Sequence, residues 1–455
     1  MNISTLKAFS VRRLNHHHHQ FYNIINPYSY HQQQQQQLFS TYQYINRINQ
    51  IKIKQLGPNS NLLPKSVTFV EENKKTVLHW RLIYFIYIDR FYTKNFINSI
   101  NDLYSQFGNI PKNILTSCPS QLFDLFKEDY NLQYAIELSQ INLTEAPVFA
   151  RLNDLKFNSL SNNSNIISNN NNSSNNTSSN NSENNDNSNS SNISNNNSNE
   201  KIILKKFINR LSNNYSEIVG QILPSENSKF GFKFEKKAEF RQWKEYKEGL
   251  FDIQDESSQL IVQELIRNIV MKEIKTLKPL ILDYCCGTGG KTFAFAGCLN
   301  GKGQIYMHDV RSEKLFPELK RRAQRLGIEN IQPIEHDHSH WDKLKDKMNL
   351  VLCDVPCTGT GTLRRNVETK YKINYQWLQE LTEKQRDIIQ KAIPFVKQDG
   401  YFLYSTCSIL KKENEKQLEW ILKKYKNFQL VHTVKILPTI DGSDGMYGVL
   451  LKRIN

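Results

Sequence analysis

Short apolar runs alternate with amphipathic segments from about Asp255 to the end of the chain. Runs with the length of buried strands lie at 279–283, 304–309, 331–335, 349–353 and 400–405. The segments between and after them predict helices over 257–272, 293–299, 312–326, 375–396 and 411–425, and final strands near 428–436 and 446–452. This alternation predicts an α/β fold, with a mostly parallel sheet wound by helices on both faces.

The chain before this region has a different pattern. Apolar residues recur at helical spacing over 75–107, which predicts a helical subdomain reaching about Ser139, and 147–153 predicts a strand. Residues 158–200 are almost wholly Asn and Ser and bury too little apolar surface to offset the entropy of ordering them. A helix is predicted to resume at Ile202, so we interpret 75–246 as one N-terminal subdomain interrupted by a disordered insertion, followed by a catalytic domain over 247–455.

The segment Phe230 to Phe240 is rich in aromatic and basic residues. Such a mixture is typical of a groove that binds nucleic acid. A pair of strands with solvated lysines explains it equally well, and the sequence leaves both interpretations open.

Composition favours an anionic partner. The 455 residues include 59 Lys and Arg against 44 Asp and Glu, a net charge of +15, and nucleic acid is the leading candidate. No apolar run approaches the roughly 20 residues of a membrane span, so no membrane association is expected. The seven cysteines show no spacing typical of a zinc site, and we expect no bound metal and reduced thiols.

The first seventy residues contain no acidic residue but carry scattered Lys and Arg among hydroxyl-bearing and aromatic residues. This composition is typical of organellar transit peptides, so residues 1–74 are expected to be disordered and to direct the protein to the mitochondrion. A plain disordered tail, with the protein in the cytoplasm or nucleolus, is the alternative.

Acidic residues follow several predicted strands. Glycines after the first strand allow a ligand to approach the backbone, Asp309 is placed to bind a ribose diol, and Asp337 an adenine amine. Asp283 is either a ligand or an anchor for the loop. Together these positions predict a nucleoside cofactor across the carboxyl ends of the strands.

Two thiols end neighbouring strands, Cys357 after the fourth and Cys407 after the fifth. A thiolate can add to carbon 6 of cytosine, which makes carbon 5 nucleophilic toward an electrophilic methyl group. Asp354 could assist by holding a proton against the ring nitrogen if burial raises its pKa. A base must then remove the proton from carbon 5 so that the thiolate can leave.

Three motifs resemble those of one family: 283–292 (DYCCGTGGKT), 354–366 (DVPCTGTGTLRRN) and 404–409 (YSTCSI). They are similar to the signatures of the Sun/Fmu-type RNA (cytosine-5-)-methyltransferases, related to bacterial 16S ribosomal RNA methyltransferases. The clear resemblance covers 247–453, and Pro147 to Lys156 is similar to the family's N-terminal RNA-binding strand. It implies a Rossmann-like, S-adenosylmethionine-dependent methyltransferase fold with a seven-stranded mixed sheet.

The resemblance also implies roles for individual residues. Cys407 is expected to be the nucleophile, Cys357 to assist product release, and Asp354 to contact the target base. In DNA cytosine methyltransferases the Pro-Cys thiol attacks instead, so this assignment depends on finding both cysteines. The residues expected to bind S-adenosylmethionine are Cys285, Cys286, Gly287, Thr288, Gly289, Gly290, Lys291, Asp309, Asp337 and Asp354.

Arg364 and Arg365 are expected to contact RNA phosphates beside the target base, with a solvated pair as the alternative. The sequence departs from the family pattern at Thr288 and Val367, where many members have proline, and at Met446-Tyr447, where Phe-Phe is common. These changes remove no reacting group but can alter local loop geometry.

The favoured function is methylation of carbon 5 of a cytosine in ribosomal RNA by a monomer, with association with a ribosomal subunit left open. Transfer RNA is the alternative substrate. A catalytically silent RNA-binding or ribosome-assembly protein is the second alternative, opposed by the presence of Cys357, Asp354 and Cys407. A nucleoside triphosphatase is disfavoured because Cys285 occupies the position of the first glycine of a P-loop.

Overall fold

The computed structural model describes residues 113, 116–156, 191–334 and 338–454. The expected transit segment, the helix predicted over 75–107 and Asp337 lie outside these residues. The chain divides into two units, residues 1–117 and 118–455, and the fold below is that of the second unit.

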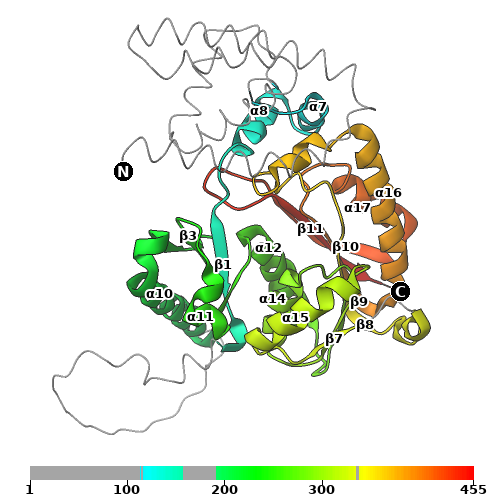
Figure 1. Ribbon diagram of the computed structural model, residues 1–455. Helices are drawn as coiled ribbons and strands as arrows, with labels where there is room; N and C mark the ends of the chain where they lie inside the picture. The colour runs from blue at the N-terminus through cyan, green and yellow to red at the C-terminus, as the bar shows by residue number, and fades with distance from the viewer. Residues whose placement is uncertain (1–112, 114–115, 157–190, 335–337, 455) are drawn as a thin grey trace, which may run out of the picture. The chain divides into compact units, whose positions relative to one another are not determined.

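The larger sheet has seven strands in the order β10-β11-β9-β8-β5-β6-β7 (Figure 1). Its strands are β5 (Leu280–Asp283), β6 (Gln304–Met307), β7 (Ile331–Pro333), β8 (Met348–Asp354), β9 (Val396–Thr406), β10 (Phe428–Ile436) and β11 (Met446–Arg453). The first five pair in parallel, whereas β11 pairs antiparallel with both β9 and β10. The predicted mixed, mostly parallel seven-stranded sheet is confirmed.

Alternate residues of the central strands enter two separate cores. Leu350, Leu352 and Leu403 pack on one face against α14 (Gly290–Leu299) and α15 (Ser312–Leu326). Val351, Cys353 and Phe402 face the other way, toward α16 (Tyr375–Ala392) and α17 (Glu415–Lys424). Successive side chains of a strand point to opposite faces, so a strand covered on both sides reads as a continuous apolar run.

Several predicted boundaries differ from the structure. The amphipathic segment near 257–272 consists of α12 (Glu256–Ile261), a π-helix (Val262–Val270) and α13 (Met271–Glu273). The helix after 375 ends at Ala392, because Pro394 lies in a short 3₁₀ turn that leads into β9. Within the described residues the 3₁₀ segments are Phe240–Gln242, His338–Leu344, Val367–Tyr371 and Ile393–Phe395, the last of which holds Pro394.

A second sheet has the order β2-β3-β1-β4. Its strands are β1 (Val148–Leu152), β2 (Ile222–Pro224), β3 (Gly231–Phe234) and β4 (Phe251–Ile253), beside α10 (Ser191–Val219) and α11 (Lys244–Lys247). The helix α10 therefore begins within the Asn/Ser tract, earlier than the predicted Ile202. Phe230, Phe232 and Phe234 are buried in this subdomain's core. The strand interpretation of this segment holds, and its aromatic rings are buried rather than exposed.

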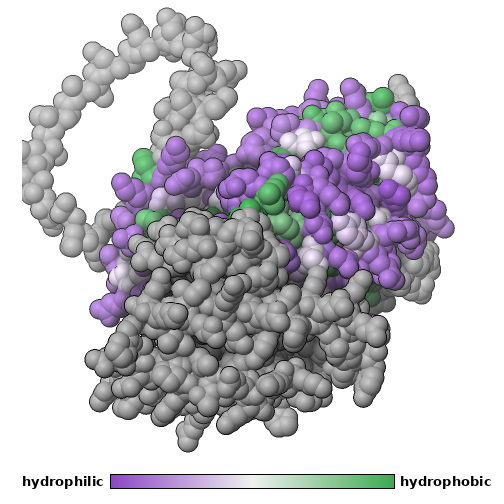
Figure 2. Space-filling model, turned by 90° about the horizontal axis from the view of Figure 1, so that it is seen from above, coloured by the Kyte–Doolittle hydropathy of each residue, from purple (hydrophilic) through white to green (hydrophobic). Residues whose placement is uncertain are grey.

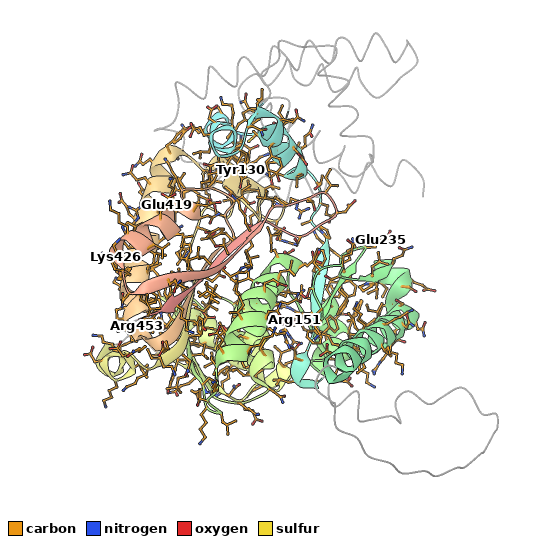
Figure 3. The ribbon with its side chains drawn as sticks, turned by 180° about the vertical axis from the view of Figure 1, so that it is seen from behind. Tyr130, Arg151, Glu235, Glu419, Lys426 and Arg453 are labelled. Carbon is orange, nitrogen blue, oxygen red and sulfur yellow. The ribbon has the colours of Figure 1, made fainter. Side chains whose placement is uncertain are left out.

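Two helices, α7 (Ser120–Asp129) and α8 (Leu132–Ile141), pack on the loops that follow the two thiols, through a core that includes Leu363, Ile409 and Leu410. At the end of α7 the Tyr130 hydroxyl donates to the Ile409 carbonyl at 2.6 Å, and Asp129 accepts the Lys411 amide at 2.7 Å. Figure 3 labels Tyr130 at this junction. The helical pair thus fixes the chain just after Cys407.

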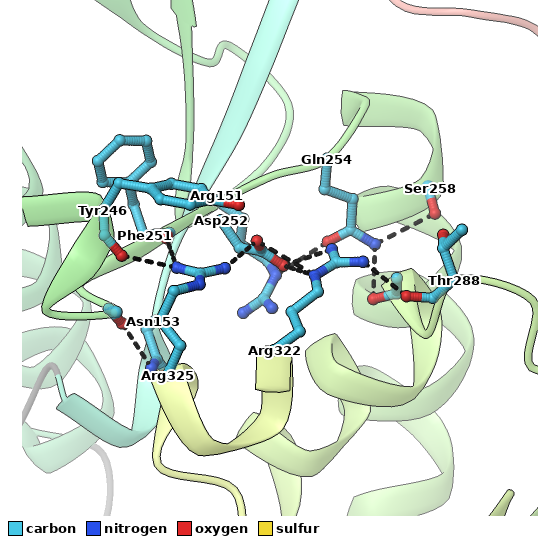
Figure 4. A network of polar contacts seen from close by, with 12 residues as sticks. Arg151, Asn153, Tyr246, Phe251, Asp252, Gln254, Ser258, Thr288, Arg322 and Arg325 are labelled. Atoms are coloured by element: carbon cyan, nitrogen blue, oxygen red, sulfur yellow. Dashed lines mark hydrogen bonds and ion pairs between the residues drawn. The ribbon is translucent and has the colours of Figure 1, made fainter. Parts of the chain in front are cut away.

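An arginine-rich network joins the four-stranded sheet to the larger one (Figure 4). The buried Asp252 of β4 accepts Arg322 at 2.5 Å and Arg325 at 2.6 Å, both from α15. Arg322 also donates to the Thr288 carbonyl at 2.6 Å, and Gln254 donates to the Gly290 carbonyl at 3.1 Å. The glycine-rich turn is therefore held by Gln254, beside the smaller sheet, and by Arg322 of α15, which Asp252 of that sheet binds.

The coloured residues on the face seen in Figure 2 are largely hydrophilic, and the apolar ones among them form separate small patches. Within the part of the chain that the structure describes, no helix combines the length and apolarity needed to cross a bilayer.

Candidate active site

The carboxyl ends of β5, β6, β8 and β9 bring the predicted site residues together. β5 is flanked by β6 and β8, so the strand order reverses direction there, and ligands of such sheets bind at this switch point. Asp283 ends β5, Asp309 follows β6, Asp354 ends β8, and Cys407 follows β9 directly.

The turn after β5 is shaped by two glycines with left-handed backbone, Gly287 (φ +51°) and Gly289 (φ +78°). A Cβ at Gly289 would lie 2.7 Å from Leu319 and Phe293, so no larger residue fits there. A Cβ at Gly287 would meet nothing within 4 Å. The backbone at Gly287 therefore faces open space that a ligand can enter.

Asp283 anchors this turn. Its carboxylate accepts the Thr292 hydroxyl at 2.5 Å, and burial raises the pKa of Asp283 to about 7. Its other oxygen, Oδ1, has no hydrogen-bond partner. Of the two interpretations of Asp283, the structure supports the loop anchor.

The other residues of this turn that are expected to bind the cofactor make hydrogen bonds through their backbone atoms. The Cys286 amide donates to the His308 carbonyl at 2.9 Å, and the Thr288 and Gly290 carbonyls are occupied by Arg322 and Gln254. Burial raises the pKa of both the Cys285 and Cys286 thiols. These cysteines are therefore poor nucleophiles.

Asp309 receives the Gly287 amide at 3.0 Å on Oδ2 and the Arg311 amide at 2.9 Å on Oδ1. Burial opposes its ionisation, but hydrogen bonds from Arg311 and Gly287 outweigh this and lower the pKa of the Asp309 carboxyl. A charged carboxylate next to the open backbone of Gly287 suits a ligand with a vicinal diol.

The site residues fit S-adenosylmethionine. Gly287 leaves room against the backbone, Asp309 offers a carboxylate, and α14 begins at Gly290, with its N-terminus at the turn. Such a helix end favours a carboxylate ligand, because its first backbone amides lack helical partners. Asp337, the expected adenine contact, lies outside the described residues.

Asp309→Ala is expected to weaken S-adenosylmethionine binding at least about tenfold, because the diol loses its acceptor and the Gly287 amide its partner. Isothermal titration calorimetry measures the change. Arg311→Ala is the control, because it keeps the carboxylate and removes only its exposed partner. Unchanged affinity in Asp309→Ala would show that Asp309 does not hold the cofactor.

Lys291 and Asp354 form an ion pair across the site, with Nζ 2.6 Å from Oδ2. Lys291 is buried, whereas about a third of the Asp354 side chain is exposed. The expectation for Asp354 supposed a buried side chain, whereas the structure has it partly exposed and paired with Lys291. The pair presents one anionic and one cationic group to a ring beside the thiols.

The two thiols lie against each other, with Cys357 Sγ 3.3 Å from Cys407 Sγ. The hydrogen bond with Cys407 and burial raise the pKa of the Cys357 thiol, and the nearby charge of Glu413 adds to the effect. This favours a state in which Cys357 keeps its proton beside the sulfur of Cys407. The geometry suits one attacking sulfur and one proton-bearing helper.

The Arg364 side chain is buried, whereas a contact with an RNA phosphate requires an exposed side chain. Its guanidinium is buried and donates to the carbonyls of Thr439, Gly442 and Ser443 at 2.7–2.9 Å. The predicted RNA contact does not fit this buried position, because Nη1 and Nη2 both donate to the loop before β11. Arg365 is partly exposed and pairs with Asp255 at 2.7 Å and Asp444 at 2.5 Å, so its RNA contact stays a prediction.

Arg364→Met is expected to destabilise the fold by roughly 3 kcal/mol, because buried carbonyls lose their donor. Thermal unfolding measures the change. Arg365→Met, which removes a partly exposed side chain, is expected to lower the melting temperature less. Weaker RNA binding by Arg364→Met with normal stability would restore its predicted role.

Sequence reasoning missed several buried polar residues beneath the thiols. Glu413, Asn414 and Gln385 are fully buried and hydrogen-bond to the loops that carry Cys357 and Cys407. Glu413 and Asn414 stand before a helix, where polar residues are ordinary, so no signal in the sequence singled them out.

The family of 16S rRNA methyltransferases RsmB/F matches residues 273–450. A probable ribosomal RNA small subunit methyltransferase B of Synechocystis is 33% identical over 187 residues, which cover 40% of each chain. The human 28S rRNA (cytosine(4447)-C(5))-methyltransferase is 33% identical over 157 residues, 34% of this chain and 19% of the human protein. The chain thus spans less than half the length of these relatives.

Solved structures share the fold. A methyltransferase homolog from Pyrococcus horikoshii is similar with a TM-score of 0.54 and 19% identity, covering 75% of this chain and 98% of that one. NSun6 from the same organism, solved with SFG, has a TM-score of 0.52 and 16% identity, covering 74% and 98%. Residues 273–450 thus match the RsmB/F family of 16S rRNA methyltransferases, and the chain shares its fold with these solved structures.

Proposed function

We propose that this protein transfers a methyl group from S-adenosylmethionine to carbon 5 of a cytosine in ribosomal RNA. The observation that carries the proposal is the pair of thiols 3.3 Å apart, at the ends of the adjacent parallel strands β8 and β9. The Lys291–Asp354 ion pair and the glycine-rich turn lie at the same edge of the sheet. One edge of the sheet therefore carries the groups proposed as nucleophile, helper thiol, base-binding pair and cofactor site.

In the proposed reaction the Cys407 sulfur adds to carbon 6 of cytosine, and Lys291 and Asp354 hold the polar edge of the ring. S-adenosylmethionine, when bound, supplies an electrophilic methyl group. Carbon 5, made nucleophilic by the addition, forms the new carbon–carbon bond. A base then takes the proton from carbon 5, the carbon–sulfur bond breaks, and Cys407 leaves as a thiolate.

Cys357 is assigned to the release step, as base or as a relay to one. Its raised pKa supports this assignment, because a thiol that keeps its proton is a weak nucleophile, and its thiolate, once that proton has passed to solvent, is a strong base toward the carbon 5 proton. Cys357 then carries the proton from carbon 5, and Cys407 leaves as the thiolate that attacked, so the pair returns to its starting state.

Ribosomal RNA is proposed as the substrate because the curated relatives described above carry names for ribosomal RNA methylation. Transfer RNA is the alternative. Bisulfite sequencing of RNA from cells lacking the protein tests both, since a lost 5-methylcytosine marks the substrate. If both RNAs kept every 5-methylcytosine, the proposed function would be refuted.

The four-stranded sheet is proposed to bind RNA outside the catalytic site. A groove of about 450 Å³ runs beside β1 and β3, and Lys233, Lys236 and Lys237 are among its lining residues. Glu145, Glu235 and Asp441 also line it, so any affinity for phosphate depends on the placement of the lysines rather than on net charge.

A mitochondrial location is proposed from the acid-free, basic composition of the first seventy residues. Import into isolated mitochondria, with shortening of the precursor, tests this proposal. Residence of the full-length chain in the cytosol would contradict it.

A further inference from the structure

The two thiols come from loops 50 residues apart, yet their sulfur atoms lie 3.3 Å from each other. One backbone hydrogen bond joins the two loops, from the Gly361 amide to the Cys407 carbonyl at 2.9 Å, and the placement of the two thiols needs further restraints. The restraints are polar side chains buried beneath the thiols.

The peptide groups on both sides of Cys357 are held by side chains. Gln385 of α16 donates to the Pro356 carbonyl at 3.1 Å. Glu413 accepts the Thr358 amide on Oε1 at 2.9 Å and the Thr358 hydroxyl on Oε2 at 2.5 Å. Gln385 also donates to Glu413 at 2.8 Å, which joins the two restraints.

The residues on both sides of Cys407 are held in the same way by Asn414. Its Oδ1 accepts the Thr406 hydroxyl at 2.6 Å, and its Nδ2 donates to the Ser408 carbonyl at 2.8 Å. One amide side chain therefore spans Cys407 from the preceding residue to the following one.

A layer of hydroxyl groups connects the two loops directly. Thr360 Oγ1 lies 3.0 Å from Ser408 Oγ and accepts the Ile409 amide at 3.0 Å. These hydrogen bonds act together with the apolar packing of Leu363, Ile409 and Leu410, and hydrogen bonds have the narrower distance and angle limits.

Glu413 and Asn414 are both fully buried, so neither reaches RNA or cofactor. Burial of a carboxylate is unfavourable unless donors surround it, and burial raises the pKa of Glu413 despite the donors that oppose this shift. The loop geometry that the hydrogen bonds of Glu413 impose explains why this carboxylate is buried despite the free-energy cost.

We propose that Glu413 and Asn414 are positioning residues that together set the separation of the two thiols. Glu413 holds the Cys357 loop, Asn414 holds the Cys407 loop, and the two residues are joined by a single peptide bond. A shift of about 1 Å in a reacting group can reduce a rate about 100-fold, so this spacing matters for two thiols that address one ring. The kinetic part of the inference rests on the proposed function, whereas the thiol separation does not.

The separation is tested on the full-length chain without RNA by dibromobimane, which bridges two neighbouring thiols by replacing both of its bromines and then fluoresces. Mass spectrometry of peptides identifies the Cys357–Cys407 bridge among the other cysteines. Glu413→Ala and Asn414→Ala are expected to slow this bridging about tenfold. Glu413→Gln is expected to restore part of the rate, because its amide oxygen still accepts the Thr358 amide.

Glu419→Gln is the matched control, on the exposed side of α17 (Figure 3), and is expected to bridge at the wild-type rate. Thermal unfolding checks that each variant is folded. If Glu413→Ala does not fold, Thr358→Val and Thr358→Ser decide, because valine removes the hydroxyl that donates to Glu413 and serine keeps it. Slow bridging is expected for Thr358→Val and not for Thr358→Ser.

In methyl transfer, folded Glu413→Ala and Asn414→Ala are expected to lose kcat about 10- to 100-fold with unchanged KM for RNA and cofactor. Wild-type bridging rates in both folded alanine variants, or equal rates in the two Thr358 variants, would overturn the inference. Normal bridging by a wild-type protein that transfers no methyl group would refute the proposed function alone.

Discussion

Cys407→Ala is expected to abolish methyl transfer, with a fall in kcat of about 10⁴-fold or more. Without the sulfur that adds to carbon 6, carbon 5 of cytosine is too weak a nucleophile to accept a methyl group at a useful rate. Transfer of radiolabelled methyl from S-adenosylmethionine to RNA measures the loss. Cofactor binding is expected to be unchanged, because the glycine-rich turn and Asp309 belong to other strand ends.

Cys298→Ala is the matched control. This thiol lies in α14, outside the loops that carry the two reacting cysteines, and donates to the Ala294 carbonyl within its own helix. Its removal is expected to leave methyl transfer near the wild-type level. Substantial methyl transfer by Cys407→Ala would show that another group attacks the base.

Cys357→Ala is expected to trap a covalent complex between the protein and RNA. Attack by Cys407 remains possible, but loss of the carbon 5 proton and departure of the thiolate are slowed, so turnover falls while the adduct accumulates. A shift of the protein band on a denaturing gel, removed by ribonuclease, measures the adduct.

The double variant Cys357→Ala/Cys407→Ala supplies the control, since an adduct formed through Cys407 must disappear in it. If Cys407→Ala formed the adduct and Cys357→Ala did not, the attacking and releasing roles of the two thiols would have to be exchanged. Both experiments require reductant, because thiols 3.3 Å apart can be joined by oxidation.

The strand ends could be predicted because their signals are local. The apolar run before Asp354 needs no knowledge of its partners to read as a buried strand, and small residues and glycines after such a run indicate a loop. β8 and β9 lie side by side in parallel, and this pairing brings Cys357 and Cys407 together as the sequence implied.

The role of Arg364 could not be predicted in this way. Its partners are carbonyls of residues 439–443, about 75 residues further along the chain, and backbone carbonyls leave no mark in a sequence. An arginine beside an expected nucleic-acid site reads the same whether its guanidinium faces solvent or a buried loop.

The sequence of the aromatic segment near β3 contains a signal for burial, but this signal alone did not decide between the strand and the groove. Phe230, Phe232 and Phe234 recur at every second position, which places them on one face of a strand. Periodicity of this kind favours a buried face over a groove, and the structure has these rings in the core of the smaller sheet.

The arginine network at the glycine-rich turn makes the two sheets thermodynamically coupled. Asp252 of the smaller sheet holds Arg322, and Arg322 holds the carbonyl of Thr288 in the turn. A ligand that alters the turn also alters the free energy of contact between the sheets, and linkage makes this effect reciprocal. A structural change in the smaller sheet is therefore expected to change the affinity of the turn for its ligand.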